Sequence, residues 1–248
     1  MKYDLVFDPP LMNAAGSLGF SPPPRKEVDL ARLGAFITNP VSLGPRHPAS
    51  DSCCMAYPGG FLLHSGHPNP GLKGVVRRYR ERWKRAPTPV LVHLLIQDVA
   101  EAAQMAARLE PLAGVIAGLE LGLPPWVEAV QAIDMIKTVS GELPVIVRLP
   151  HERAAELASA IAGAVQPAAF SLGAPSGSFV APSGELIHGR LYGPGVFPQA
   201  LESFLRVKEA GLPVIAAGGV YTPDQIETLL AMGAMAVQLD AVLWRGGN

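Results

Sequence analysis

Residues 144–149 read PVIVRL, a short apolar run rich in β-branched side chains with one arginine near its end. A run of this kind, without an alternating polar face, is typical of a strand covered on both sides in a parallel sheet. Residues 213–217, PVIAA, repeat the pattern. The sequence therefore predicts a buried parallel sheet that is covered by helices.

Eight such runs alternate with segments of helical periodicity. The expected strands are Leu11–Gly16, Ala35–Val41, Pro89–Leu95, Gly118–Leu123, Pro144–Leu149, Ala168–Gly173, Pro213–Ala217 and Ala234–Leu239. The clearest expected helices are Val99–Leu109, Trp126–Val139, Glu152–Val165, Pro198–Ala210 and Pro223–Met232. Right-handed crossovers close such a chain into a (β/α)8 TIM barrel, although an open doubly wound sheet would give a similar alternation.

The length of 248 residues suits one barrel domain over residues 1–248. The chain ends soon after the last expected strand, at Trp244–Asn248, so we expect the eighth outer helix to be shortened or absent. The 25 prolines and 26 glycines gather in long joints at residues 21–24, 40–60 and 173–195. These joints follow strands one, two and six, which places them at the C-terminal mouth, where barrel enzymes keep their chemistry.

Composition limits the class of protein. Hydrophobic residues make up 49% and the formal net charge is -1, which excludes a disordered chain and leaves no overall field that would recruit nucleic acid. The basic run at residues 77–85 is interpreted as a solvated helix face rather than a polyanion site. No segment suits a bilayer or a signal peptide, and Cys53 and Cys54 are adjacent, so we expect a cytoplasmic protein without a disulfide.

Six motifs, in order, resemble the dihydroorotate dehydrogenase family, particularly its soluble class. They are Pro10–Gly16 on the first strand, Leu33–Asn39 with the following Pro45-Arg46, Gly60–Gly71, Gly189–Pro194, Ile215–Val220 and Gly233–Leu239. Gly60–Gly71 matches the family's substrate-side loop in its glycines and in its Asn-Pro-Gly ending. The resemblance covers nearly the whole chain and implies the barrel fold.

The resemblance also implies FMN as a cofactor, held at the barrel mouth. The residues that it assigns to the flavin are Ala15, Gly16, Arg148, Gly193, Gly218 and Gly219. In flavin-binding barrels the phosphate lies among backbone N–H groups of the last two βα loops. Gly218 and Gly219 would let the backbone approach that phosphate, or they would only form a tight turn.

The chain departs from the family at several functional positions. The strand-two lysine is Asn39, the substrate asparagine is absent at Leu63, and the asparagine-rich motif after strand four becomes residues 122–126, GLPPW. The loop with the family's general base has no convincing equivalent, so the sequence nominates no catalytic residue. Arg148 replaces the strand-five lysine, which keeps a positive charge in a different shape.

The largest departure from the family lies after the last expected strand, in the second of the two loops that hold the flavin phosphate in the family. The family's Gly-Thr is here Asp240-Ala241. A carboxylate about 4 Å from a phosphate costs roughly 4 kcal/mol per charge pair at an effective dielectric near 20, unless Asp240 turns outward. Tyr192 replaces a serine above the same loop, where it would stack on a ligand or fill the vacated pocket.

Several other residues are of types that bind metals or anions or take part in catalysis. His64 and His67, with Cys53, Cys54 and Asp51, contain metal-ligating types, but their spacing favours incidental histidines in a proline-rich loop, and no metal is expected. His93 is interpreted as a satisfied core histidine. Glu120 matches an acidic family position that looks structural, and the glycine-rich residues 173–178 are either an anion site or a flexible loop.

Two functions follow from the resemblance and its departures. The first is an FMN-dependent oxidoreductase, related to pyrimidine biosynthesis by family, that does not act on dihydroorotate. The alternative is a non-catalytic, flavin-free barrel that acts as a binding or partner subunit. In both cases we expect a small-molecule ligand at the barrel mouth, and analogy with soluble relatives suggests a homodimer.

Overall fold

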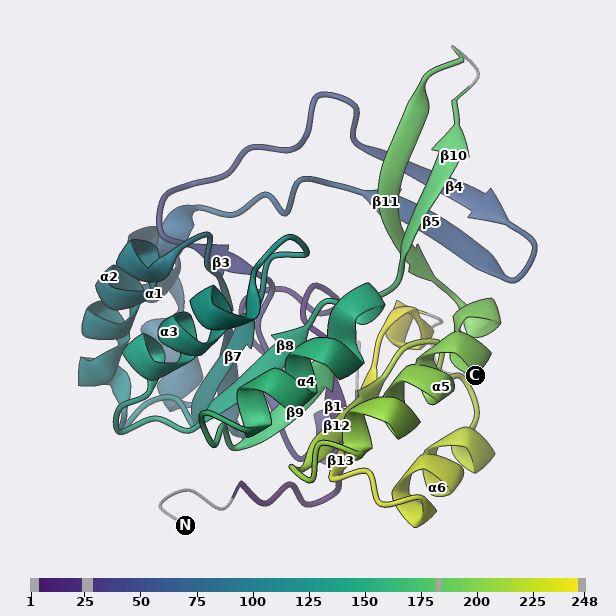
Figure 1. Cartoon of the computed structure of the whole chain (residues 1–248). Coiled ribbons are helices and arrows are strands. Elements are labelled where there is room, and N and C mark those ends of the chain that lie inside the picture. Colours follow the sequence, from purple (N-terminus) through teal and green to yellow (C-terminus); the bar gives the residue numbers. More distant parts are fainter. Residues whose placement is uncertain (1–4, 24–28, 182–183, 245–248) are drawn as a thin grey trace.

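Eight parallel strands form a nearly closed barrel in the computed structural model, which describes residues 5–23, 29–181 and 184–244 (Figure 1). Their order is β1-β13-β12-β9-β8-β7-β6-β2, and a parallel bridge between Met12 and Ala35 joins the two end strands. The strands are β1 (Leu11–Asn13), β2 (Phe36–Ile37), β6 (Val90–Leu95), β7 (Gly118–Gly122), β8 (Val145–Leu149), β9 (Ala169–Leu172), β12 (Val214–Ala217) and β13 (Ala236–Leu239). A short strand, β3 (Val41–Ser42), also pairs with β6. The predicted (β/α)8 barrel and its eight strands are confirmed.

Helices cover the outside of the barrel. They are α1 (Gly71–Lys84), α2 (Val99–Leu109), α3 (Ala129–Val139), α4 (Ala154–Ala162), α5 (Phe197–Lys208) and α6 (Pro223–Ala231). Helix α6 begins where the sequence predicted, because Thr222 and Gln225 form a capping box in front of the apolar stripe. The arginines of α1 at positions 77, 78, 80 and 82 are exposed while Leu72, Val75 and Trp83 are buried, so the basic run lies on a solvated face.

The alternation of side chains along each strand sorts the barrel interior into layers. Leu91, Ile146, Ala169 and Ala236 point inward and form an apolar layer. Two residues further along the same strands, toward their C-terminal ends, stand His93, Arg148, Ser171 and Gln238, and β7 adds Glu120. The strand period therefore places a polar layer directly above the apolar one, at the barrel mouth.

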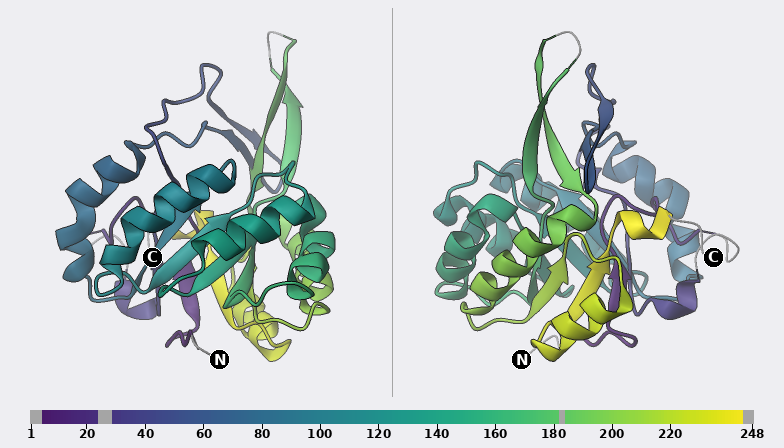
Figure 2. Two further views of the ribbon diagram at one scale, coloured as in Figure 1. Left: turned by 60° about the vertical axis from the view of Figure 1, so that its left-hand side comes forward. Right: turned by 90° about the vertical axis from the view of Figure 1, so that its right-hand side faces the viewer.

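A second, antiparallel sheet lies at the mouth, and we call it the mouth sheet. Its order is β10-β11-β5-β4, made of β10 (Ser176–Val180), β11 (Leu186–Tyr192), β5 (Gly60–His64) and β4 (Cys53–Tyr57). Figures 1 and 2 show β10 and β11 rising away from the barrel, with β4 and β5 beside them. The sequence predicted a loop at residues 60–71, which was wrong for Gly60–His64, and a flexible loop was one of two interpretations of residues 173–178, of which residues 176–178 belong to β10. β5 pairs with β11 from the other long joint, and β10 pairs with β11 across residues 181–185, so neither pairing can be read from local periodicity.

The end of the barrel is short in the described residues. After β13 the structure has a 3-10 turn, Ala241–Trp244, and residues 245–248 lie outside the described part, as does Pro24 in the first long joint. Other 3-10 turns are Leu30–Arg32, Glu110–Leu112, His151–Arg153 and Pro194–Val196. Among the residues that the structure describes, no helix has the length and apolar character to cross a bilayer.

Candidate functional site

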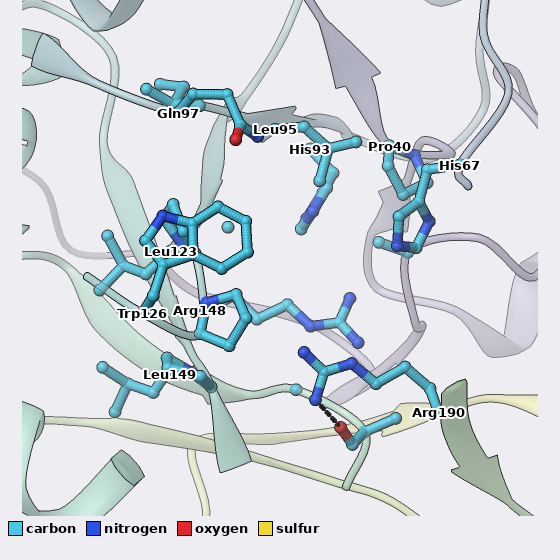
Figure 3. Close-up of a pocket in the computed structure, with 18 of the residues that line it drawn as sticks. Pro40, His67, His93, Leu95, Gln97, Leu123, Trp126, Arg148, Leu149 and Arg190 are labelled. Atoms are coloured by element: carbon cyan, nitrogen blue, oxygen red, sulfur yellow. Dashed lines mark hydrogen bonds between the residues drawn. The ribbon is translucent and has the colours of Figure 1, made fainter. Parts of the chain in front are cut away.

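A cavity of about 280 Å³, which we call the mouth cavity, opens at the C-terminal ends of β6, β7 and β8. This is the face on which barrel proteins assemble active sites. Figure 3 shows His93 and Arg148 from the barrel, His67 from the joint after β5, and Arg190 from β11 directed toward the same space. Its apolar walls come from Pro40, Leu95, Ile96, Leu123, Pro124, Pro125, Trp126, Leu149 and Tyr192.

Glu120 is the centre of the buried polar layer below this cavity. Its side chain is fully buried, and its Oε1 accepts hydrogen bonds from Ser171 Oγ and from Gln238 Nε2, each at 2.7 Å. Its Oε2 lies 2.6 Å from His93 Nδ1 and 3.9 Å from an Arg148 guanidinium nitrogen. A carboxylate with this many donors is well satisfied, so the expectation that Glu120 is structural agrees with its contacts.

The charge states of the pair follow from these contacts. Burial opposes ionisation of Glu120, but the hydrogen bonds from His93 and Gln238 and the charge of Arg148 outweigh it and lower the pKa of Glu120 to about 2. Burial lowers the pKa of His93 more than Glu120 raises it. At neutral pH the pair is therefore an ionised glutamate and a neutral histidine. Because the carboxylate only accepts, the proton of His93 is on Nδ1, and Nε2 carries a lone pair.

The interpretation of His93 as a satisfied core histidine is only half right. The residue is 3% exposed and Nδ1 is hydrogen-bonded, as expected. Its other nitrogen, Nε2, lines the mouth cavity and makes no hydrogen bond with any residue that the structure describes. Gly122 leaves room for it, since a Cβ there would stand 2.8 Å from Nε2.

Positive charge converges on the mouth cavity. Arg46, Arg148 and Arg190 line it, and none of its described lining residues carries a carboxylate. The pKa of His67 is lowered in this environment, first by desolvation of its ring and then by the effect of His93. The three arginines lower it further, to about 4. The cavity is therefore suited to an anion.

The three arginines differ in how many of their N–H donors are already hydrogen-bonded within the protein. Arg190 donates to Ala174 O at 3.1 Å and to Ser176 Oγ at 2.6 Å, and lies 3.5 Å from Glu152. Arg46 donates to Gly66 O at 3.1 Å. Arg148 is only 14% exposed, and its guanidinium makes no hydrogen bond within the described part of the chain. Arg148 therefore has donors to offer to a ligand.

A second cavity, of about 260 Å³, lies beside the first and shares Ala15, Pro40, His67 and Tyr192 with it. It is lined by Gly16, Asp240 and Ala241, and by Trp244, whose Nε1 donates to Ser17 O at 2.7 Å. The Tyr192 ring stacks on Phe61 with ring centres 5.4 Å apart, and Phe61 also contacts Trp244. Tyr192 is thus held by another aromatic ring at the border of both cavities.

The backbone next to this cavity forms what we call the cradle: Gly218 and Gly219 after β12, and Asp240 and Ala241 after β13. Asp240 does not turn outward, because it is only 8% exposed. The N–H of Ala241 donates to its Oδ1 at 2.5 Å, and the N–H of Gly219 also donates to this carboxylate. Burial raises the pKa of Asp240, although these hydrogen bonds and the charge of Arg148 oppose the shift.

The cradle therefore does not fit the phosphate of FMN. The N–H groups of Gly219 and Ala241, which would hold a phosphate in this fold, are hydrogen-bonded to a carboxylate of the chain itself. An added phosphate would also meet the charge of that carboxylate, at a cost of roughly 4 kcal/mol at 4 Å. Asn39 has its own structural role, since its Oδ1 accepts from Gly19 N at 2.9 Å.

The glycines of the cradle have a structural reason that involves no ligand. Gly219 has φ +68°, and a Cβ there would stand 2.4 Å from Phe197 N, at the start of α5. A Cβ on Gly218 would be 2.9 Å from Ala200 Cβ, and one on Gly193 would be 2.4 Å from Gly60 Cα. These contacts support the tight-turn interpretation of the glycines.

The six residues assigned to a flavin are only partly brought together. Ala15 lines both cavities, Gly16 lines the second, and Arg148 lines the mouth cavity. Gly193, Gly218 and Gly219 line neither. Arg46, His67, His93 and Arg190 were not assigned to the site from the sequence. Only the alternating pattern of β11, LIHGRLY, carried a signal that Arg190 shares a face with Tyr192.

The candidate metal ligands do not form a cluster. His64, at the end of β5 rather than in a loop, lies 3.2 Å from Asp51, and Cys53 and Cys54 are both free thiols on β4. Within the described residues, no three His, Cys, Asp or Glu side chains are placed to hold one metal ion.

Comparisons with known proteins point in one direction. No family model matches the chain. A dihydroorotate dehydrogenase B (NAD(+)) catalytic subunit from Desulforudis audaxviator is 32% identical over 258 residues, covering 94% of this chain and 82% of that protein. The same subunit from Geobacter sp. (strain M21) is 30% identical over 251 residues, covering 93% and 82%. The crystal structure of a dihydroorotate dehydrogenase from Eimeria tenella with ferulenol superimposes with a TM-score of 0.68 at 14% identity, covering 96% and 77%.

Proposed function

Because the chain belongs to the dihydroorotate dehydrogenase family, we propose that it is a flavin-free member that binds a small organic anion in the mouth cavity. Homology to catalytic subunits supports a dihydroorotate dehydrogenase-like oxidoreductase as the broad class from which it descends. The finer function depends on whether the barrel mouth still holds FMN.

A single observation carries the proposal: the carboxylate of Asp240 accepts the N–H groups of Gly219 and Ala241. Without those donors a phosphate loses its hydrogen bonds and gains a like charge as a neighbour. The combined effect lowers the affinity for FMN by about a thousandfold or more. The mouth cavity, in contrast, keeps a partly buried arginine, Arg148, without a hydrogen-bond partner among the described residues. An anion bound there would supply what Arg148 lacks.

The competing function is an FMN-dependent oxidoreductase that acts on a substrate other than dihydroorotate. Arg148 favours it, because this cation lines the cavity that a flavin ring would enter, together with Ala15. In that case Ala15, Gly16 and Arg148 would hold the flavin, and Gly193, Gly218 and Gly219 would shape the turns around it. FMN would supply hydride transfer. The relatives are named catalytic subunits, so assembly with another subunit, or as a homodimer, stays a prediction here.

The deciding experiment compares the wild type with the double variant Asp240→Gly/Ala241→Thr, which restores the dipeptide of the family. Each purified protein is titrated with FMN and with riboflavin, and binding is followed by flavin absorbance and fluorescence. We expect a colourless wild type and a variant that binds FMN about a thousandfold more tightly than the wild type does. Riboflavin has no phosphate, so its affinity should change little between the two proteins.

Three results would contradict the proposal. A wild type that is yellow as purified, with about one flavin per chain, would favour the FMN-dependent function. Oxidation of dihydroorotate by the purified protein would contradict both functions. A variant that binds FMN no better than the wild type would show that Asp240 is not the cause of the loss.

A further inference from the structure

The chemistry of the mouth cavity narrows the anion to one class. The relevant groups are His93 and Arg148, which approach the same atom of Glu120. His93 Nδ1 lies 2.6 Å from Glu120 Oε2, and Arg148 lies 3.9 Å from it. Glu120 is held in turn by Ser171 and Gln238. The acceptor on His93 and the donors on Arg148 are therefore neighbours on a fixed support.

Arg148 and His93 require opposite hydrogen-bond partners from a ligand. Arg148 presents up to five N–H donors, and none is hydrogen-bonded to a residue in the described ranges. A carboxylate matches such a guanidinium with two parallel hydrogen bonds. His93 presents a lone pair on Nε2, because Glu120 fixes the proton on Nδ1. It therefore needs a hydrogen-bond donor from the ligand, next to the carboxylate.

We infer that Arg148 and His93 together bind a small 2-hydroxycarboxylate, with its carboxylate on Arg148 and its hydroxyl donating to His93 Nε2. The inference rests on the proposed function, in which the cavity is free of flavin. The size of the cavity agrees with a small ligand, because about 280 Å³ lies just below the roughly 300–1,000 Å³ that is usual for pockets of drug-sized ligands.

Close chemical relatives of such a ligand fit less well. A simple carboxylate leaves Nε2 without a partner. A 2-oxo acid turns a carbonyl oxygen toward the lone pair of Nε2, where two acceptors repel each other. A 2-amino acid brings an ammonium group into a cavity already lined by Arg46, Arg148 and Arg190. The hydroxyl is the substituent that gives a neutral donor.

The rim of the cavity has room for ligand atoms beyond the carboxylate and the hydroxyl. Arg190 retains donors that are not used by Ala174 or Ser176, and Trp126, 66% exposed, stands at the entrance. A second carboxylate on the ligand would lie toward Arg190. L-malate should therefore bind at least as tightly as L-lactate.

The test uses four molecules of nearly equal size: L-lactate, pyruvate, L-alanine and propionate. Each is titrated into the wild-type protein at pH 7 by isothermal calorimetry. We expect L-lactate to bind about tenfold to a hundredfold more tightly than propionate, which is the effect of leaving one buried acceptor unpaired. Pyruvate and L-alanine should bind more weakly still.

Variants assign the preference to particular atoms. His93→Gln should bring the ratio of lactate to propionate affinity close to one, while propionate affinity hardly changes. Arg148→Gln should weaken both ligands by about tenfold or more. His188→Gln is the matched control, because this exposed histidine of β11 contacts Ser178 outside the cavity, and it should leave binding unchanged.

A wild-type measurement keeps the inference testable if the His93 variant does not fold. In protein labelled with ¹⁵N-histidine, the Nε2 resonance of His93 should move on addition of L-lactate and stay in place with propionate. Equal affinities for lactate and propionate, or an unchanged ratio in folded His93→Gln, would overturn the inference. The flavin titration is independent of this result, so a colourless protein that ignores lactate would refute the ligand class alone.

Discussion

The mouth cavity and the cradle lie at the same end of one barrel, and both present groups that attract anions. They differ in whether a carboxylate of the chain itself occupies the site. In the cradle, backbone N–H groups hold a carboxylate that belongs to the chain, Asp240. In the mouth cavity, arginines gather around a space that no carboxylate of the described lining residues enters. The first site is satisfied by the fold alone, whereas in the second the guanidinium of Arg148 makes no hydrogen bond with a described residue.

The difference teaches how a barrel can change its ligand without changing its fold. In the cradle, a carboxylate of the chain occupies the backbone N–H groups that a phosphate would need, and the two glycines have a structural role of their own because α5 packs against them. In the mouth cavity, the polar layer rests on Glu120, which the fold already supports. Three changes would test this contrast, from the largest expected effect to the smallest.

The largest effect should come from Glu120→Gln. This change removes the only carboxylate that contacts His93 and Arg148 in the described structure, and it sets an amide N–H₂ against donors. Breaking a buried charged pair costs roughly 3–5 kcal/mol, so the free energy of unfolding should fall by about that amount in urea denaturation. Ser171→Ala, which removes one neutral donor from the same carboxylate, should cost about 1 kcal/mol. Equal losses would mean that Glu120 is no centre of the layer.

The same residue gives a pH dependence with a definite sign. The pKa of Glu120 is lowered from 4.5 in the unfolded chain to about 2 in the fold. Its contribution to stability is therefore complete above pH 4.5 and is lost as the pH falls toward 2. The wild type should lose stability in this window more steeply than Glu120→Gln does, as measured by urea unfolding at a series of pH values.

A smaller loss, of about 2–3 kcal/mol, should follow from Gly219→Ala in the cradle. The new Cβ would stand 2.4 Å from Phe197 N in a backbone with φ +68°, so strain and overlap add. Gly211→Ala is the control, because Gly211 has φ +78° but no atom within 4 Å of a Cβ, and it should cost about 1 kcal/mol. Equal costs in thermal unfolding would mean that packing does not explain why the cradle keeps its glycine.

The smallest effect should come from Asp240→Asn. This change should alter how the free energy of unfolding depends on pH. Burial raises the pKa of Asp240 above its ordinary 3.8, so the fold favours the protonated form. This contribution to stability is complete below pH 3.8 and is lost as the pH rises through the raised value. The variant should lack this decline in urea unfolding between pH 3 and 7. A decline of the same size in both proteins would mean that Asp240 does not titrate in the cradle.

Much of this barrel could be predicted from local patterns. The runs PVIVRL and PVIAA are buried on both faces, and their period of two also explains why Arg148 points into the barrel above Ile146. The predicted start of a helix at Pro223 agrees with α6, which Thr222 caps. These signals depend only on residues that are close together in the chain.

The site was less predictable because it is built by pairings between distant segments. Arg190 reaches the mouth cavity only because β11 pairs with β5, with Arg190 opposite Leu63. Likewise, the direction of Asp240 depends on where Gly219 lies beside it. The sequence showed that Asp240 was unusual, but it could not show whether the carboxylate turns toward the cradle or away from it.

The mouth sheet also has a consequence for the order in which the molecule assembles. Its central pair joins β5 to β11, and four barrel strands, β6 to β9, lie between them in the chain. Bringing together such distant segments has a large entropic cost unless the intervening chain is already compact. We therefore expect the central barrel strands to fold first and the mouth sheet to close afterward. Arg148 and Arg190 would then meet only in the last step of folding, which makes anion binding a property of the finished molecule and of no earlier intermediate.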